Sequence, residues 1–151
     1  MQKGEIKNMP ERSAKAEWTG SLLEGKGKMA LGSGLFEGAF SFNTRMGDEP
    51  GTNPEELLGA SLAGCYTMAL NATLEKNGTP ATSVHSEAKV YLGKDETGFV
   101  IKHIDLETKA DVDGIDDSTF QELALATKKG CPISKALAAV TINLTADLAK
   151  S

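Results

Sequence analysis

Two cysteines are the residues of this chain whose type points most directly to chemistry. Cys65 and Cys131 are the only cysteines among the 151 residues, and 66 positions separate them. One pair in a chain of this size is not a disulfide framework, and two thiols with two distant histidines lack the spacing of a zinc site. Such a pair can act as a redox couple, in which one thiol is oxidised and the other resolves it into a disulfide. The competing interpretation is that both thiols are buried packing groups.

The local sequence does not decide which thiol an oxidant attacks. Cys65 lies in a stretch rich in Leu and Ala, and apolar surroundings raise the pKa of a thiol. Cys131 begins a predicted helix, with Pro132 as its first residue, and it follows Lys128 and Lys129. A helix N-terminus and nearby cations both favour the thiolate, so Cys131 looks at least as reactive on these grounds.

A cation is needed if Cys65 is to attack as a thiolate, and the chain has two arginines, Arg12 and Arg45. Arg45 precedes the helix that carries Cys65, where its guanidinium can pair with Glu55 and still direct a donor at the sulfur. Glu55 and Cys65 are ten residues apart, about 15 Å along a straight helix, so they cannot touch. Three arrangements would resolve this separation. In the first Arg45 bridges the two residues, in the second the helix bends near Gly59, and in the third a second subunit supplies one of the groups.

The elements that position these residues are organised around residues 52–78. Asn53 and Pro54 start a helix there, and Asn77 with Gly78 ends it. Apolar residues occur nearly all the way round, so we expect burial on most sides. Such a helix is about 36 Å long, and one sheet of a small domain covers only one side of it. We therefore expect an obligate homodimer with this helix near the twofold axis.

The rest of the chain alternates between strand and helix signals. Alternating polar and apolar residues predict strands over residues 13–19, 35–43, 84–92, 99–112 and 140–148. A capping box of Ser118 and Gln121 predicts a second helix ending at Gly130, and residues 131–137 open a short third one. Residues 45–51 are expected to be a loop. This order predicts an α+β fold with a mainly antiparallel sheet, a lead-in over residues 1–11 and a single domain over residues 12–151.

Composition excludes several classes of protein. The net charge is −5, the pI is about 5.1, and the lysines are scattered, which argues against a nucleic-acid partner or an anionic membrane surface. No uninterrupted apolar run approaches the length of a membrane span, and the polar N-terminus lacks the apolar core of a signal peptide. We expect a cytoplasmic protein.

Three motifs together resemble one known family. The sequences TNPEELLGASLAGCYTMAL, GCPISKAL and FNTR, in this order and spacing, closely resemble the OsmC/Ohr family of organic hydroperoxide peroxidases, and the OsmC branch in particular. The resemblance extends from about Ala16 to the C-terminus. It implies an intertwined α+β homodimer, with mainly antiparallel sheets around long central helices and two active sites at the subunit interface. It also implies an osmotically inducible antioxidant protein of the oxidative stress response that needs no cofactor, metal or prosthetic group.

The same resemblance assigns roles to four residues. Cys65 in AGCY matches the peroxidatic cysteine, and Cys131 in GCP matches the resolving one. Glu55 in NPE matches the catalytic glutamate, and Arg45 in FNTR matches the arginine of the OsmC branch. The Ohr branch places its arginine near the N-terminus, where Arg12 is the only candidate, and Arg45 fits better.

The implied function is the reduction of organic hydroperoxides, and more slowly of hydrogen peroxide, through a Cys65 sulfenic acid and a Cys65–Cys131 disulfide. An external thiol or dithiol, with a lipoyl-type dithiol as one candidate, would then reset the pair. Two alternatives remain at this point. One is a non-catalytic dimer that binds a small apolar ligand, and the other is a thiol-based redox sensor.

Overall fold

The computed structural model describes residues 9–149, and the chain divides into two compact units. The first unit ends at Asn53 and the second begins at Pro54. Most of the expected lead-in over residues 1–11 lies outside the described residues. The single domain expected over residues 12–151 stays a prediction.

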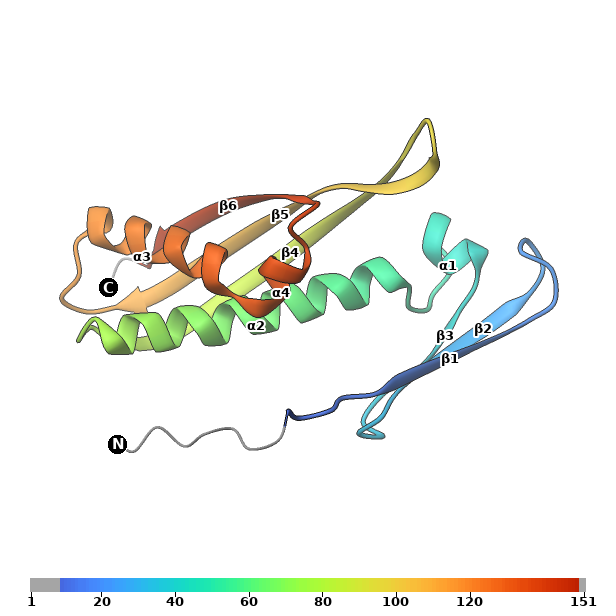
Figure 1. The fold of residues 1–151 in the computed structure, drawn as a ribbon, viewed down its shortest axis with the longest axis horizontal. Coiled ribbons are helices and arrows are strands. Elements are labelled where there is room, and N and C mark those ends of the chain that lie inside the picture. The colour runs from blue at the N-terminus through green and yellow to red at the C-terminus, as the bar shows by residue number, and fades with distance from the viewer. Residues whose placement is uncertain (1–8, 150–151) are drawn as a thin grey trace. The chain divides into compact units, whose positions relative to one another are not determined.

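The first unit is built on a three-stranded antiparallel sheet in the order β1-β2-β3 (Figure 1). Its strands are β1 (Ala14–Thr19), β2 (Lys26–Leu31) and β3 (Glu37–Phe40). The rings of Trp18 and Phe40 lie 5.4 Å apart, and both come so close to Gly27 that a Cβ there would overlap them. Gly27 therefore allows the two aromatic rings to meet across the central strand.

The structure corrects the sequence prediction just after β3. The strand expected to reach residue 43 ends at Phe40, and α1 (Phe42–Met46) follows it. Ser41 caps this helix: the Thr44 N–H donates to Ser41 Oγ (3.1 Å) and the Ser41 N–H donates to Thr44 Oγ1 (2.8 Å). This reciprocal pair satisfies two backbone donors and stabilises a helical turn. Arg45 therefore lies on a helix, and the prediction of a loop starting at residue 45 is wrong.

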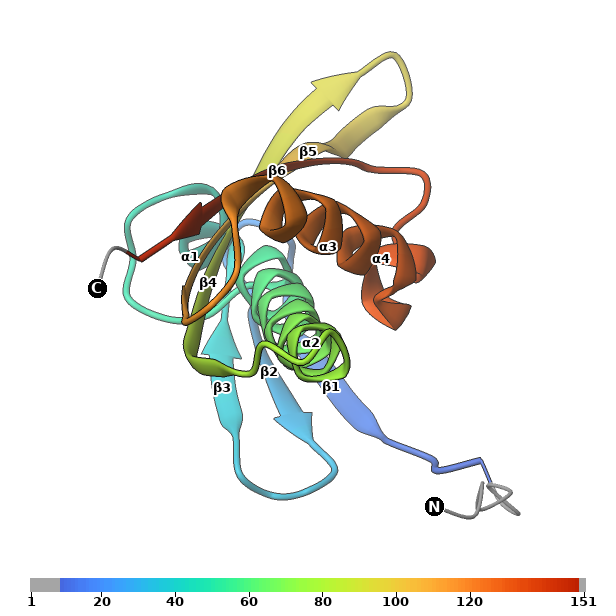
Figure 2. The ribbon, with the colours of Figure 1, turned by 90° about the vertical axis from the view of Figure 1, so that its left-hand side faces the viewer.

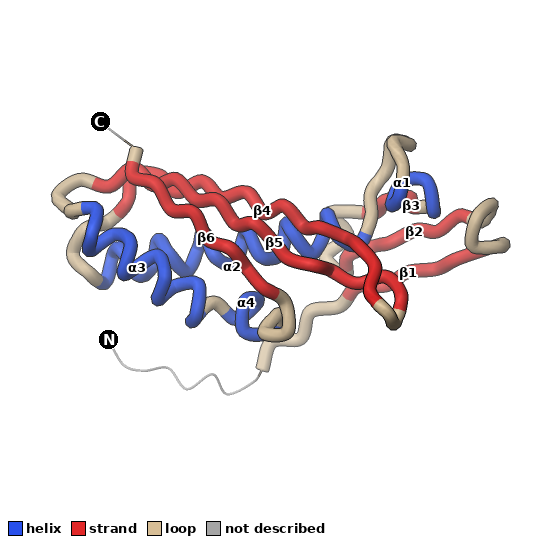
Figure 3. The backbone as a smooth tube through the Cα atoms, turned by 90° about the horizontal axis from the view of Figure 1, so that it is seen from above, coloured by secondary structure: helices blue, strands red, loops and turns tan. Residues whose placement is uncertain are grey.

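The second unit places three helices on one face of a three-stranded sheet (Figures 2 and 3). Its elements are α2 (Pro54–Lys76), β4 (Ala81–Asp95), β5 (Gly98–Val112), α3 (Asp117–Gly130), α4 (Pro132–Ala136) and β6 (Thr141–Leu148). The fully buried side chains of its core are Leu62, Tyr66, Leu70, Leu74, Ile104, Leu106, Ala110, Phe120 and Ala124. They come from α2, β5 and α3, so these elements share one apolar core.

The sheet of the second unit has the order β4-β5-β6. The expected long hairpin is present, since β4 and β5 pair antiparallel. β6 pairs parallel with β5, which requires a crossover, and α3 and α4 provide it. The predicted α+β architecture with mainly antiparallel sheets is confirmed, with this one parallel pair.

The long helix α2 forms where the sequence predicts it. Gly78 adopts a φ of +82°, its N–H donates to the Glu75 carbonyl (2.9 Å), and the Thr79 N–H donates to the Leu74 carbonyl (3.0 Å). This is the left-handed stop expected from Asn77 and Gly78.

Within a single chain α2 is buried on one face only, and its burial on the other sides by a partner subunit stays a prediction. Its buried residues lie on one face, namely Gly59, Leu62, Tyr66, Leu70 and Leu74, whereas Met68 is 78% exposed. A single sheet can cover only one face of a helix. The helix is long and apolar enough to cross a membrane, with a mean hydropathy of 1.3. Its buried face packs on the core of its own unit, as the central helix of a globular protein does.

The start of α3 differs from its prediction. Its cap is Asp116, whose Oδ1 accepts a hydrogen bond from the Thr119 N–H (2.8 Å), and Ser118 does not fill this role. Gln121, expected in a capping box, donates to the Ala146 carbonyl on β6 (2.7 Å). Gly130 is helical, so α3 continues to the residue before Cys131.

A buried hydroxyl links α2 to α3 and gives a test of this packing. The Tyr66 hydroxyl is buried and donates to the Ala124 carbonyl (3.0 Å). We expect Tyr66→Phe to lower the free energy of unfolding by about 1 kcal/mol in denaturant titrations, because the hydrogen bond is lost. The matched control is Tyr91→Phe on the half-exposed Tyr91, with an expected change within about 0.5 kcal/mol. Equal losses in the two variants would contradict this account.

Candidate active site

The two cysteines meet in the second unit. Cys65 lies midway along α2, and Cys131 is the residue that joins α3 to α4. Their Sγ atoms are 2.9 Å apart, and both thiols are free. A disulfide bond is about 2.05 Å long, so the sulfurs need to approach by only about 0.9 Å to form one. The fold thus brings together two residues that are 66 positions apart in the sequence.

The junction between α3 and α4 fixes the position of Cys131. The Cys131 N–H donates to the Thr127 carbonyl (2.9 Å) and completes α3, and the Cys131 carbonyl accepts from the Lys135 N–H (3.0 Å) and begins α4. Pro132 occupies the first position of α4, where a missing N–H causes no loss. Cys131 is therefore held by backbone bonds on both sides.

The two sulfurs differ in their access to solvent. Cys131 is 1% exposed, whereas Cys65 is half-buried. A dissolved reagent therefore reaches Cys65 more easily than Cys131.

The surroundings of the sulfurs affect the two thiols in opposite directions. Burial raises the pKa of Cys65, and the hydrogen bond shared with Cys131 raises it further, against an opposing backbone N–H of Ile133. Burial also raises the pKa of Cys131, but the hydrogen bond with Cys65, the backbone N–H groups of Ser134 and Ile133, and the nearby Ser134 hydroxyl together outweigh it, so that this pKa falls. Within this chain, the first negative charge is better accommodated on Cys131.

Ser134 is a residue of this site that sequence reasoning missed. It lies one helical turn after Cys131, it is buried, and its hydroxyl contributes to the lower pKa of Cys131. The spacing C-P-I-S at the start of a short helix was the available signal, because residues three apart share a helix face. What the sequence could not reveal was that this face is buried.

The structure places Arg45 and Glu55 in different units. Arg45 lies on α1 of the first unit, and Glu55 lies in the first turn of α2 in the second. The approach of Arg45 to Cys65, and its pairing with Glu55, stay predictions. Gly59, where a bend was one alternative, brings the backbone of α2 close to β4: a Cβ there would lie 3.3 Å from the Ala88 carbonyl oxygen.

The remaining titratable groups of the described residues do not form a metal site. Within the described residues 9–149, no group of three or more histidine, cysteine or acidic side chains is arranged to hold a metal ion. His103 stacks on Tyr91, with ring centroids 4.3 Å apart, and its Nε2 lies 3.7 Å from Asp105 Oδ1. These three residues are partly exposed, as expected for a solvent-side strand face.

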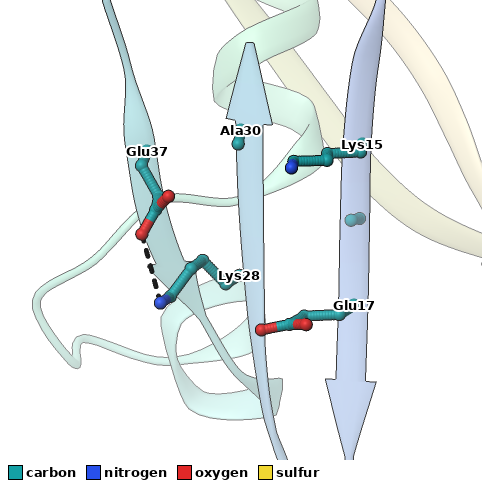
Figure 4. Close-up of a pocket in the computed structure, with 6 residues that line it drawn as sticks. Lys15, Glu17, Lys28, Ala30 and Glu37 are labelled. Atoms are coloured by element: carbon teal, nitrogen blue, oxygen red, sulfur yellow. Dashed lines mark ion pairs between the residues drawn. The ribbon is translucent and has the colours of Figure 1, made fainter. Parts of the chain in front are cut away.

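A hollow on the sheet of the first unit carries charges but no nucleophile. Figure 4 shows Lys15, Glu17, Lys28 and Glu37 projecting from the three strands, and Lys28 Nζ lies 3.1 Å from Glu37 Oε1. The lysine and glutamate of that pair are half-exposed, so this is a solvated strand face. The sulfur pair is thus the reactive group with the strongest structural support.

Comparison with known proteins gives one consistent family. Residues 47–145 match the family described as "OsmC-like protein". Peroxiredoxin OsmC of Escherichia coli is 42% identical over 129 residues, which cover 85% of this chain and 90% of that protein. Organic hydroperoxide resistance protein OhrB of Bacillus subtilis is 33% identical over 94 residues, 62% of this chain and 68% of that protein.

Solved structures agree with the sequence matches. The crystal structure of OhrB from Bacillus subtilis superimposes with a TM-score of 0.68 at 27% identity, and covers 91% of this chain and 98% of that one. An organic hydroperoxide resistance protein from Elizabethkingia anophelis reaches a TM-score of 0.74 at 22% identity, over 97% of this chain and 100% of that one. The second likeness supports the fold alone.

Fold and site together define an α+β protein with a long central helix and two adjacent thiols. With the sequence matches, the chain belongs to the OsmC-like family. The resemblance seen in the cysteine motifs is thereby confirmed.

Proposed function

We propose that this protein reduces organic hydroperoxides through a Cys65 sulfenic acid and a Cys65–Cys131 disulfide, which an external thiol then reduces. That it is a peroxidase follows from its family and from the names of its relatives. The chemical route, the residues and the substrate preference are the proposal. The observation that carries it is the distance of 2.9 Å between one half-buried and one fully buried sulfur.

The unequal access of the two sulfurs supports the order of events. Cys65 is the sulfur that a peroxide reaches, and its thiolate attacks one peroxide oxygen. The O–O bond breaks, an alcohol leaves after taking a proton, and Cys65 becomes a sulfenic acid. The adjacent Cys131 then attacks the oxidised sulfur, a disulfide forms and water leaves.

A cation has to offset the cost of charge on Cys65, because burial raises the pKa of this thiol. We assign this role to Arg45, with Glu55 orienting it. A guanidinium can hold a carboxylate and present a further donor to the sulfur. The same group would favour the negative charge that develops on the leaving oxygen.

The alkyl tail of an organic hydroperoxide should strengthen its binding at this site. The site lies on an apolar helix, and burying an alkyl tail gains about 0.8 kcal/mol per CH₂. We therefore assign organic hydroperoxides as the preferred substrates over hydrogen peroxide. A thiol or dithiol, such as a lipoyl-type dithiol, completes the cycle, and the cytoplasm is the assigned location.

An unfinished core supports a homodimer. Among residues 9–53 the only buried residues are Gly25, Gly27, Thr44 and Thr52, and Leu35 is 90% exposed. A three-stranded sheet needs an apolar cover to be stable. The first unit has almost no core, and α2 exposes Met68. A second copy of the chain would cover both surfaces, and we place the active sites at that interface.

The route predicts a distinct fate for each cysteine variant. After one equivalent of cumene hydroperoxide, both thiols of the wild type should be lost as an intramolecular disulfide, seen by thiol titration and non-reducing peptide mapping. Cys65→Ser should abolish peroxide consumption, and Cys131→Ser should leave a single turnover. Two persistent thiols in the wild type would instead support a non-catalytic ligand-binding dimer. Equal rates with hydrogen peroxide would count against the substrate preference.

The two arginines give a matched pair of variants. Arg45→Ala should lower the rate constant of Cys65 oxidation about 10²-fold, since a preorganised charge donor in an active site typically contributes 10²–10³. Arg12→Ala should stay close to the wild type, because the matching motif surrounds Arg45. Stopped-flow measurement of the reaction with hydroperoxide gives both values. A larger loss of rate in Arg12→Ala than in Arg45→Ala would instead assign the role to Arg12, the position expected for the Ohr branch.

The dimer is tested by mass in solution. Light scattering should give twice the chain mass of 15.9 kDa for the wild type. Met68→Glu should shift the equilibrium toward the monomer, because it buries a charge at the proposed interface. Leu125→Glu, on the exposed surface of α3, is the matched apolar-to-acidic control and should stay dimeric. A wild-type monomer at micromolar concentration would rule the dimer out.

A further inference from the structure

Ser134 carries the one buried side-chain oxygen or nitrogen atom that lacks a hydrogen-bond partner in the part of the chain that the structure describes. The residue is 8% exposed, in the first turn of α4. Buried polar groups are nearly always paired, so an unpaired hydroxyl in a packed region requires an explanation. A group whose partner forms only during the reaction is one such explanation.

The candidate partner is the sulfur of Cys131. Ser134 follows Cys131 by three residues on a helical turn, and its hydroxyl is one of the groups that lower the pKa of this thiol. A neutral thiol is a weak hydrogen-bond acceptor, whereas a charged sulfur is a strong one. A hydroxyl hydrogen can rotate to meet it. The contact therefore strengthens when Cys131 loses its proton.

We propose that Ser134 is a positioning residue for Cys131, and that its hydroxyl donates a hydrogen bond to Cys131 Sγ whenever this sulfur is a thiolate. The inference rests on the proposed function insofar as catalysis produces that thiolate, and it adds a residue that the four assigned ones do not include.

Cys131 carries the charge at two points of the proposed cycle. In the first, the Cys131 thiolate attacks the sulfur of the Cys65 sulfenic acid. The S–S bond forms, the S–O bond breaks, and hydroxide leaves and is protonated to water. The Ser134 hydroxyl stabilises the negative charge on the attacking Cys131 sulfur and fixes its orientation.

The second point is reduction of the disulfide by a dithiol. Its thiolate reaches Cys65, the more exposed sulfur, and forms a mixed disulfide there. The Cys65–Cys131 bond breaks, and its electron pair stays on Cys131 Sγ. The second thiol of the reductant then attacks the mixed disulfide and frees Cys65. A leaving sulfur with a lower pKa departs faster, so the Ser134 hydroxyl should accelerate this step.

The backbone N–H groups of Ser134 and Ile133 also lower the pKa of Cys131, and the Ser134 hydroxyl is the side-chain donor of α4 that adds to them. From α2, Cys65 and Tyr66 face the sulfur, and burial raises the pKa of Tyr66, so its phenol stays neutral. The Tyr66 hydroxyl already donates to the Ala124 carbonyl. The core residues of β5 and β6 in the same cluster, such as Ile104, Leu106 and Ile142, are apolar. Three lysines flank Cys131 along the chain, at positions 128, 129 and 135.

The test measures the ionisation of Cys131 directly, in full-length protein that also carries Cys65→Ala. Thiolate absorbance against pH should show that adding Ser134→Ala raises the pKa of Cys131, so that the thiolate fraction at a fixed pH falls about tenfold. Ser118→Ala, an exposed serine, is the control and should change nothing. Ser134→Thr and Ser134→Val, which have similar shapes, give a second comparison in which only threonine keeps a hydroxyl.

A second readout uses the intact cysteine pair. Reduction of the preformed disulfide by dithiothreitol should slow about tenfold in Ser134→Ala, and Ser134→Thr should restore it. A Cys131 pKa that is the same with and without the hydroxyl, in both comparisons, overturns the inference whatever the peroxidase assays give. A wild type that consumes no peroxide, together with a shifted Cys131 pKa, rejects the proposed function and leaves the Ser134–Cys131 hydrogen bond standing.

Discussion

The contact between the two sulfurs depends on how α3 is held against α2. Two polar links fix that packing inside an otherwise apolar layer: the Tyr66 hydroxyl to the Ala124 carbonyl, and the Thr127 hydroxyl to Thr73 Oγ1 (3.2 Å). Both join α2 to α3: Tyr66 is the residue after Cys65, and Thr127 lies four residues before Cys131. Directional bonds specify register, whereas apolar packing alone allows sliding. They therefore fix the register of α3 on α2, and hence where Cys131 meets Cys65.

A reactive thiol needs both access to its reagent and stabilisation of its negative charge. In this fold Cys65 has more of the first, and Cys131 has more of the second. Packing on α2 shields Cys65 and raises its pKa, so the charge that its chemistry needs must be supported from outside its own helix. Cys131 sits at a chain turn where backbone and hydroxyl donors converge, and its pKa falls. The more accessible sulfur thus has the raised pKa, and the buried sulfur has the lowered one. The proposed disulfide exchange would benefit from this division, because the sulfur that leaves is the one whose pKa is lowered.

Most of the fold could be predicted because its elements carry local signals. The period of two in β4 and β5 and the stop at Gly78 placed the hairpin and the end of α2. The errors arose where a signal was short or depended on distant groups. The capping box at Ser41 uses threonine in place of the usual Glu or Gln. The parallel pairing of β6 is decided by the crossover, which no local pattern reveals. The proximity of the two sulfurs was expected from the family resemblance and not from a local pattern, and the burial of Ser134 was not expected; both are products of tertiary packing.

The apolar surface of α2 connects the assembly of the protein with its chemistry. By length and hydropathy this helix could cross a membrane, yet its buried face is spaced as in a globular core, from Gly59 to Leu74. The opposite face, with Met68, is what remains apolar without a cover in the single chain. Covering that face removes water from the surroundings of Cys65. A drier site strengthens any ion pair made to the thiolate and at the same time makes an uncompensated thiolate less favourable. In the proposed dimer, assembly and the supporting cation would therefore be coupled: a covered α2 without a guanidinium at the sulfur would hold Cys65 neutral, and the guanidinium would have its full effect only when the helix is covered.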